Sequence, residues 1–294
     1  MSDEKSKATL LKEEIMMKGS KGAATLNAEE IKKADDFCVG YKKFLDHSPV
    51  EREAVSYTLE LAKKAGFTEY DENASYNAGD KVYYVNRDKA IALAVIGKNG
   101  VKNGARLAIA HIDSPRIDLK PNPLYEDTNL ALFKTHYYGG LKKYQWTALP
   151  LSLHGTVVKL DGTKVNITWG DDENESCFCV TDLLPHLAKD QVSKPLAKVF
   201  TGEDLNVLVG SRPYEDGNDE KDLVKLNVMS ILNKKYGIVE GDFLSAELCL
   251  IPSFKARDIG FDASMIGGYG HDDKVCAYPA LMASLDVETP EQTC

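Results

Sequence analysis

The hydrophobic and polar positions along the chain change their period twice. Between residues 27 and 65 the apolar side chains recur at the three- and four-residue spacing of helices. Between 81 and 113 they gather in short runs that are typical of strands, and from about 120 to 255 short alternating segments dominate. The pattern therefore predicts a helical beginning, an α/β part and a β-rich middle.

Two helices are predicted in the first of these regions. Asn27 and Glu30 have the spacing of a capping box, and apolar residues follow at helical spacing over 31–45. A second helix is expected to begin at the Ser-Pro-Val-Glu stretch 48–51, with the serine as its cap and proline at its first position. It should end just before Gly66, a natural left-handed stop.

Three strands are predicted next. The segments 81–86 and 90–97 indicate neighbouring strands. The segment 105–113 is a nearly continuous apolar run, which is typical of a strand buried on both faces of a sheet between helices. Its polar residues, His111 and Asp113, come only at its C-terminal end, the end where sites form in open α/β sheets.

The middle of the chain has a different character. Asp161-Gly162, between two alternating segments, is a hairpin signal. A helix is predicted over 219–236, closed by Gly237, and a half-buried strand over 244–251. The acidic run 170–176 lacks the ligand spacing of a calcium loop and is interpreted as a solvated loop.

These elements predict an α/β fold interrupted by a β-rich insert. The α/β domain, a helix-flanked mixed β-sheet, comprises residues 1–119 and 256–294, and the insert comprises residues 120–255. The chain has no internal repeat and no low-complexity linker.

Composition narrows the possible partners and compartments. With 294 residues, 43% of them hydrophobic, and a net charge of -9, the chain has ordinary globular composition, and the charge argues against nucleic acid as a partner. No apolar run is long enough to cross a membrane, and the N-terminal residues lack the apolar core of a signal peptide. The six cysteines are scattered, which predicts free thiols in a reducing cytoplasm.

Two adjacent carboxylates raise the question of a metal. Asp272 and Asp273 follow a glycine-rich turn and precede an apolar run. One of them could cap the helix, but a neighbouring cation explains both better. His111 and Asp113 lie two positions apart and point to the same side, so either they form a metal ligand with its supporting carboxylate, or a buried histidine with a turn cap. Together the two pairs indicate part of a two-metal hydrolase.

Several blocks of the sequence resemble those of one family of metal-dependent hydrolases. In chain order they are AHIDSPRIDLKPNP, YYGGLKKYQWTALPLSLHGTVV, LLPHLA, EGDFLSAELCLIPSFKARDIG and GYGHDDKVCAYPALMA. Over roughly residues 10 to 290 the chain resembles the aspartyl aminopeptidases, dodecameric metallo-aminopeptidases with a co-catalytic metal pair. The resemblance implies a zinc-peptidase fold, with the insert as the dimerisation and oligomerisation domain.

The resemblance also implies a role for five residues. His111 would bind one metal ion, Asp272 would bridge two, and Asp113 would orient His111 and act in catalysis. Asp273 falls where many members have asparagine, so it would support the ligands from outside their shell. His186, in LLPHLA, resembles a loop histidine that reaches the substrate in a neighbouring subunit's active site; a surface or packing histidine is the alternative.

Two departures from the family pattern modify these expectations. The stretch 146–151 reads WTALPL where many members have an acidic, arginine-containing motif, so a neutral or broader preference for the N-terminal residue is expected. The family's other ligands and its catalytic base are a Glu-Glu pair, an aspartate and a final histidine, all downstream of the bridging aspartate. The stretch 275–294 offers no equivalent, so this chain matches an N-terminal portion of such an enzyme and is expected to be inactive alone.

The resemblance implies hydrolysis of the N-terminal residue from a peptide by a metal-activated water. The cofactor would be two divalent ions, zinc or alternatively cobalt or manganese. The full-length form would be a cytoplasmic homo-oligomer, a dimer that builds a dodecamer, with no nucleic-acid or membrane partner. Two other readings stay open: an inactive oligomerisation or regulatory fragment, and a two-metal amidase or deacylase.

Overall fold

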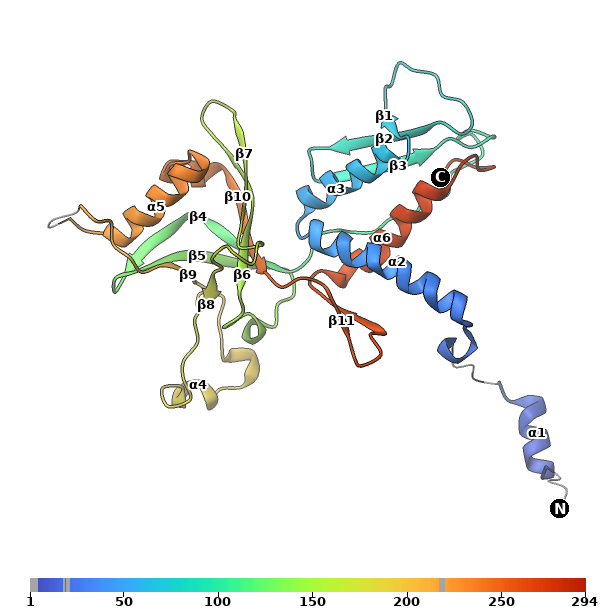
Figure 1. Cartoon of the computed structure of the whole chain (residues 1–294), viewed down its shortest axis with the longest axis horizontal. Helices are drawn as coiled ribbons and strands as arrows, with labels where there is room; N and C mark the ends of the chain where they lie inside the picture. Colours follow the sequence, from blue (N-terminus) through green and yellow to red (C-terminus); the bar gives the residue numbers. More distant parts are fainter. Residues whose placement is uncertain (1–4, 18, 20–21, 217–219) are drawn as a thin grey trace. The chain divides into compact units, whose positions relative to one another are not determined.

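The computed structural model describes residues 5–17, 19, 22–216 and 220–294 (Figure 1). By the distribution of contacts the chain divides into two compact units, one extending to Tyr41 and the other beginning at Lys42. The first unit contains helix α1 (Lys7–Ile15), a 3₁₀ turn (Gly22–Thr25) and most of helix α2 (Ala28–His47).

The predicted capping box at the start of α2 is confirmed. The Asn27 amide donates a hydrogen bond to Oε2 of Glu30 (2.9 Å), and the Glu30 amide donates one to Oδ1 of Asn27 (3.0 Å). Two amides at the helix start that would otherwise lack partners are thereby satisfied.

Helix α3 (Glu51–Lys64) begins later than the sequence predicts. Its cap is Val50, in an extended conformation, and the predicted cap Ser48 is buried with no hydrogen-bond partner for its hydroxyl among the described residues. The reason is packing, because the Val50 side chain is buried against Cys249 and Ile251, which holds this residue outside the helix. The predicted stop at Gly66 is confirmed, with φ of +87°.

A three-stranded sheet follows α3. Strand β2 (Lys81–Asn86) pairs in parallel with the short β1 (Thr68–Glu69) and antiparallel with β3 (Ala90–Val95), in the order β1-β2-β3. These strands confirm two of the predicted segments. They pack on α3 through a buried cluster made of Ala62, Phe67, Tyr83 and Val95.

The prediction of a buried strand over 105–113 is wrong for this chain. The segment forms no strand, and Leu107 and Ile109 are 78% and 86% exposed. A strand buried on both faces needs a neighbour on each edge and a layer on each face. Among the described residues its only hydrogen bond between main-chain groups is at its beginning, where the Arg106 amide donates to the Thr293 carbonyl (2.9 Å).

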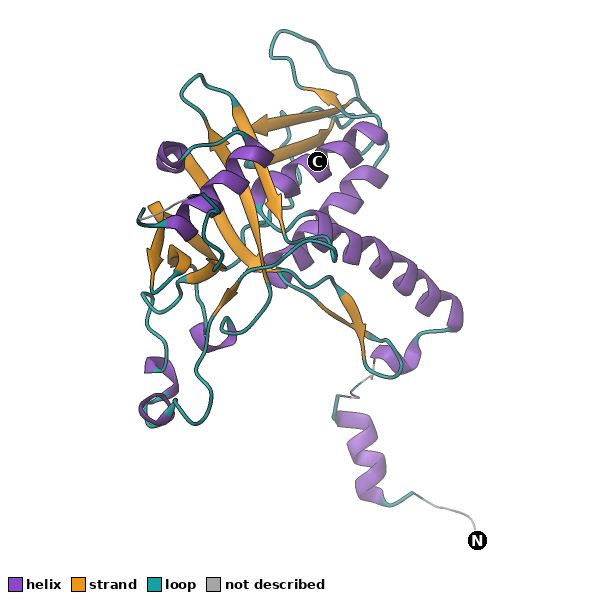
Figure 2. Cartoon of the chain, turned by 60° about the vertical axis from the view of Figure 1, so that its left-hand side comes forward, coloured by secondary structure: helices purple, strands orange, loops and turns teal. Residues whose placement is uncertain are grey.

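The middle of the chain forms an antiparallel sheet of seven strands (Figure 2). The predicted hairpin around Asp161-Gly162 is confirmed and joins β6 to β7. The order is β7-β6-β10-β4-β5-β9-β8, and the bounds are β4 (Arg116–Asp127), β5 (Leu130–Tyr138), β6 (Leu151–Val158), β7 (Lys164–Trp169), β8 (Cys179–Val180), β9 (Val207–Gly210) and β10 (Ala246–Pro252).

Helix α5 (Leu223–Tyr236) packs on this sheet across β4, β5 and β9, and Val224 and Leu232 enter the sheet's core. It begins after the predicted start, residue 219, which lies outside the described residues; Gly237 ends it with φ of +66°, as predicted. Residues 240–245 form a 3₁₀ helix (Glu240–Ser245), so β10 begins two positions later than the predicted strand.

The remaining elements are short, except for the last helix. They are the 3₁₀ turns Lys143–Gln145 and Leu196–Lys198, helix α4 (Lys189–Val192), a hairpin of β11 (Arg257–Ile259) and β12 (Met265–Gly267), and helix α6 (His271–Asp286). No helix within the described ranges is long and apolar enough to cross a membrane. The α/β class is confirmed. The boundary predicted at 119/120 falls inside β4, and the two-domain division stays a prediction.

Candidate metal site

His111 and Asp272 meet, although 161 positions separate them. Nε2 of His111 lies 3.1 Å from Oδ1 of Asp272, and its Nδ1 lies 3.0 Å from the Asp113 main-chain carbonyl. A carbonyl oxygen can only accept, so Nδ1 donates its hydrogen there. In the neutral imidazole this leaves the lone pair on Nε2, facing the Asp272 carboxylate, which is the state in which histidine binds a metal.

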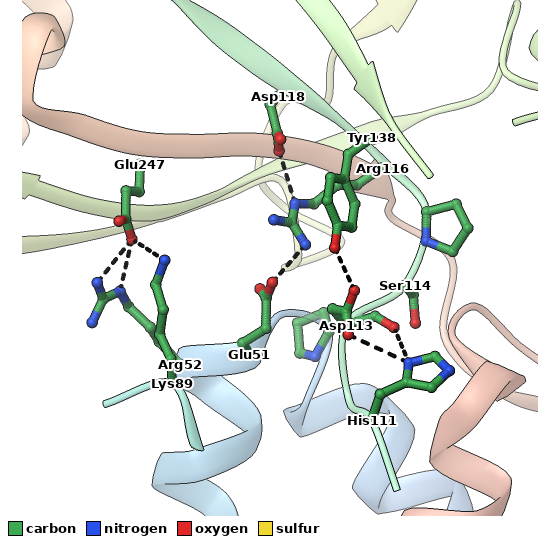
Figure 3. Close-up of polar contacts among 12 residues, drawn as sticks. Glu51, Arg52, Lys89, His111, Asp113, Ser114, Arg116, Asp118, Tyr138 and Glu247 are labelled. Atoms are coloured by element: carbon green, nitrogen blue, oxygen red, sulfur yellow. Dashed lines mark hydrogen bonds and ion pairs between the residues drawn. The ribbon is translucent and has the colours of Figure 1, made fainter. Parts of the chain in front are cut away.

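The carboxylate of Asp113 lies on the other side of the imidazole (Figure 3). Its Oδ1 is 3.4 Å from Nδ1 of His111, and its Oδ2 accepts a hydrogen bond from the Tyr138 hydroxyl (2.7 Å). That hydrogen bond is the main cause that holds the pKa of Asp113 below its usual value, against partial burial. Asp113 is therefore an ionised acceptor beside His111.

The carboxylates also act on the imidazole. Desolvation disfavours protonated His111, but the Asp113 carbonyl and the carboxylates of Asp113 and Asp272 outweigh it and raise the pKa of His111. A metal ion at Nε2 of His111 would compete with the proton that the imidazole binds. The surrounding carboxylates therefore favour either a proton or a metal ion at this nitrogen.

The two donor atoms fit zinc as part of a site. Zinc in proteins is bound by imidazole nitrogen and carboxylate oxygen, and two ligands each about 2.1 Å from a tetrahedral ion lie roughly 3.4 Å apart. The Nε2 to Oδ1 distance of 3.1 Å is compatible with this, and the side chains are 53% and 91% exposed and so accessible. In the described part of the chain no group of three or more histidine, cysteine or acidic side chains could hold a metal ion.

Asp273 lies beside this pair at the beginning of α6. A cis peptide bond joins it to Asp272, and both residues have non-helical backbone angles, so the regular helix begins after them. Its carboxylate accepts a hydrogen bond from Cys276, which raises the pKa of that thiol. The structure therefore places Asp273 next to the pair without a described contact to His111.

The structure does not bring His186 to the pair. It is exposed in a turn before α4, and within the described ranges no contact joins it to His111 or Asp272. Its role toward a neighbouring subunit stays a prediction.

Two buried residues that the sequence reasoning missed tie the segments of the site together. The Ser114 hydroxyl donates to the Asp272 carbonyl (3.0 Å) and accepts from Nζ of Lys274 (3.1 Å). Lys274 is fully buried, and burial lowers its pKa to about 8. A lysine in the first turn of a helix is usually exposed, so nothing in the sequence pattern indicated this contact.

Arg116 packs against the ring of Tyr138, whose hydroxyl binds Asp113. The sequence pattern did not indicate this contact either. The Arg116 guanidinium lies 4.4 Å from the centre of the Tyr138 ring and forms ion pairs with Glu51 and Asp118, both at 2.8 Å (Figure 3). Burial disfavours its charge, but these carboxylates outweigh burial and raise the pKa of Arg116. Arg116 and Tyr138 are direct partners across β4 and β5, which explains their contact.

A second charged group lies nearby. Glu247 pairs with Arg52 (2.8 Å) and Lys89 (3.0 Å), as Figure 3 shows. A cavity of about 310 Å³ is lined by these three residues together with Arg116 and its partners. Every charged group named here has an opposite charge beside it, so the cavity carries no uncompensated charge.

The buried His154 on β6 holds a separate cluster. Its Nδ1 is 3.0 Å from Glu53 of α3, and its Nε2 is 3.2 Å from Asp171. Desolvation disfavours the charged imidazole, but the two carboxylates raise the pKa of His154 to about 9. The prediction that the whole run 170–176 is a solvated loop is therefore wrong at one position. Asp171 points inward, because its carboxylate contacts His154.

Comparison with known proteins shows which family this chain resembles. The family described as aminopeptidase I zinc metalloprotease (M18) matches residues 44–293. A protein of Clostridium acetobutylicum described as a probable M18 family aminopeptidase 1 is 50% identical over 258 residues, which are 86% of this chain and 55% of that protein.

Solved structures agree with this relation. The crystal structure of an M18 family aminopeptidase from Thermotoga maritima superimposes with a TM-score of 0.87 at 42% identity, over 94% of this chain and 60% of that chain. A dodecamer of mApe1 from S. cerevisiae matches with a TM-score of 0.63 at 18% identity, over 88% of this chain and 59% of that one, and shows the likeness of fold alone. The chain thus spans little more than half the length of these relatives.

Proposed function

Because the chain belongs to the M18 family of aminopeptidase I zinc metalloproteases, we propose that it supplies part of a zinc aminopeptidase active site. The observation that carries this proposal is the meeting of His111 Nε2 with the Asp272 carboxylate. The reaction is hydrolysis of the N-terminal residue from a peptide.

In this proposal each residue of the site has a physical task. His111 binds the metal through Nε2, and the Asp113 carbonyl and carboxylate keep its ring turned that way. Asp272 would hold a metal ion with its carboxylate, and its second oxygen would be available to a second ion; Asp273 would support this turn. When bound, zinc supplies a Lewis acid that lowers the pKa of a coordinated water. The count of two ions is part of the proposal.

The substrate side of the proposal concerns the peptide's first residue. The stretch 146–151 carries no charged side chain, so we propose acceptance of neutral as well as acidic N-terminal residues. His186 is proposed to contact the substrate of a neighbouring subunit in a homo-oligomer, a dimer that builds a dodecamer. Assembly is proposed because the chain belongs to the M18 family, and a cytoplasmic location is proposed from its scattered cysteines.

The first test measures zinc binding. A chimera joins residues 1–294 to the part of the Clostridium relative that lies outside the match, and zinc affinity is measured by competition with a chromophoric chelator. We expect His111→Ala and Asp272→Asn each to weaken zinc binding at least tenfold, because the first removes the ligand nitrogen and the second removes the negative charge of the carboxylate. His136→Ala is the matched control, since His136 is exposed on β5 and should leave the affinity unchanged. Equal zinc affinity in all four proteins would refute the assignment.

The second test separates the open alternatives. The chimera and the 294-residue chain are assayed with aminoacyl anilides of acidic and neutral residues and with acylated amines. An aminopeptidase cleaves the first set and requires a free amino group, whereas an amidase or deacylase cleaves the second. Cleavage of neither set by the zinc-loaded chimera, while it stays folded and assembled, would favour the oligomerisation reading.

A further inference from the structure

Lys274 is a buried cation without a carboxylate directly beside it. Its side chain is fully buried, and in the described part of the chain no carboxylate forms an ion pair with it. Its Nζ instead meets the Ser114 hydroxyl (3.1 Å), the Pro49 carbonyl (3.4 Å) and the face of the Tyr269 ring, whose centre is 5.6 Å away. A buried charge that lacks an ion-pair partner lowers stability, so its presence next to the candidate metal site indicates a task there.

The direction of the hydrogen bonds that start from Lys274 is fixed. An ammonium group can only donate, so the Ser114 hydroxyl accepts from Nζ and keeps its own hydrogen to donate. That hydrogen goes to the main-chain carbonyl of Asp272 (3.0 Å). The three groups therefore form one chain of hydrogen bonds that ends on the main chain of Asp272.

Asp272 depends on such support because little packs around its side chain. The carboxylate reaches Nε2 of His111 with Oδ1 (3.1 Å), yet the side chain of Asp272 is 91% exposed. Its direction is then determined mainly by where its main chain lies. Contacts that orient a metal ligand from outside commonly change metal affinity by about ten- to a hundredfold.

The turn before α6 leaves room for the end of the Lys274 side chain. Gly270 has φ of +86°, and a Cβ there would lie 2.6 Å from Nζ of Lys274 and 3.2 Å from the hydroxyl oxygen of Ser114. The carbonyl of Pro49 accepts from the same ammonium group. Lys274 thus joins three segments of the chain, which lie before α3, before β4 and at the beginning of α6.

We propose that Lys274 is a positioning residue for the metal site, because through Ser114 it holds the main chain of Asp272 with the carboxylate toward His111. This inference rests on the proposed function of the site. An effect of charge alone would have the opposite sign, since an ammonium group near a metal site repels the ion. Removing Lys274 weakens zinc binding if the residue positions Asp272, and strengthens it if only its charge acts.

The test measures zinc affinity in the chimera described above, by competition with a chromophoric chelator. We expect Ser114→Ala to weaken zinc binding about tenfold, and Lys274→Met to weaken it as well. Ser152→Ala is the matched control and should leave the affinity unchanged, since Ser152 is also buried but its hydroxyl contacts His154 (2.9 Å). In the Ser114→Ala background, Lys274→Met should no longer lower the affinity, because the lysine acts through the serine.

Cobalt in place of zinc gives a second readout, because its visible absorption depends on how the ligands surround the ion. The spectrum should change in Ser114→Ala and stay unchanged in Ser152→Ala, which keeps the test decisive if Lys274→Met does not fold. Stronger zinc binding in Lys274→Met would overturn this inference alone, as would unchanged binding in Ser114→Ala while His111→Ala weakens it. Zinc affinity that His111→Ala also leaves unchanged would refute the proposed function, and this inference with it.

Discussion

At the residue scale, His154 shows how a buried histidine can make stability depend on pH. Its imidazole has a carboxylate at each nitrogen, and its pKa of about 9 lies above the value of about 6.5 in the unfolded chain. A group whose pKa is raised by folding stabilises fully below its unfolded pKa, and this contribution is lost as the pH rises through the folded value.

We therefore expect His154 to stabilise the fold by on the order of 3 kcal/mol at pH 6, a contribution that disappears between pH 6.5 and 9. Urea unfolding at pH 6, 7.5 and 9.5 measures it, with His154→Gln as the reference. The difference between the two proteins in the free energy of unfolding should shrink as the pH rises. A constant difference across this range would mean that His154 is neutral in the fold.

The site residues also show what sequence alone can reveal at this scale. His111 and Asp272 were predicted to belong to one site, because polar side chains that can bind metal follow one apolar run and precede another. Their contact confirms that the fold brings the two segments together. Tyr138 and Lys274 were not predicted. Tyr138 reaches Asp113 because of the register between β4 and β5, and Lys274 is buried by tertiary packing. Neither the register nor the packing can be inferred from the local spacing of residues in the sequence.

At the element scale, one glycine permits the pairing of β6 with β10 in the large sheet. Gly155 on β6 has φ of +138°, and a Cβ there would overlap the main-chain carbonyl oxygen of Glu247. β6 pairs with β7 on one edge and β10 on the other, so the backbone has little freedom to move.

We expect Gly155→Ala to lower the free energy of unfolding by more than about 3 kcal/mol, because it adds backbone strain to a main-chain clash. The matched control is Gly140→Ala, where a Cβ meets nothing within 4 Å and no positive φ is required. That change should stay within about 0.5 kcal/mol. Urea unfolding of both proteins is the measurement, and equal stability would show that the two strands can separate without cost.

The elements also divide into those that the sequence predicts and those that it does not. The strand 81–86 and the stops at Gly66 and Gly237 follow from local pattern and backbone conformation, and they are confirmed. The strand 105–113 was predicted from its composition, yet composition says only that burial is favourable. Whether a strand forms depends on partners elsewhere in the fold, and in this chain the described residues offer one only at Arg106.

At the scale of the whole molecule, a buried thiol can report on cooperative unfolding. Cys249 lies on β10 with its side chain against Val50, and burial raises the pKa of its thiol well above the usual value. Cys177 is exposed. A maleimide reagent at pH 8 should modify Cys177 within minutes and Cys249 only at the rate of global unfolding.

Mass spectrometry of labelled peptides over a urea series measures this. The labelling midpoint of Cys249 should coincide with the loss of circular dichroism, while Cys177 is labelled throughout. Early labelling of Cys249 would show that β10 separates from the residues before α3 without unfolding of the sheet.

The meeting of His111 with Asp272 has a last consequence, which concerns chain entropy. In an unfolded chain, closing a loop of 161 residues to bring these two proposed ligands together costs about 4 to 5 kcal/mol. The seven-stranded sheet between them holds that loop closed before any ion arrives, and so offsets this cost in advance. Zinc affinity at the pair is therefore linked to the folding of a sheet that the ion would never touch. A substitution deep in that sheet that unfolds it should lower zinc affinity by up to several thousandfold, which is the same free energy expressed as a ratio of dissociation constants.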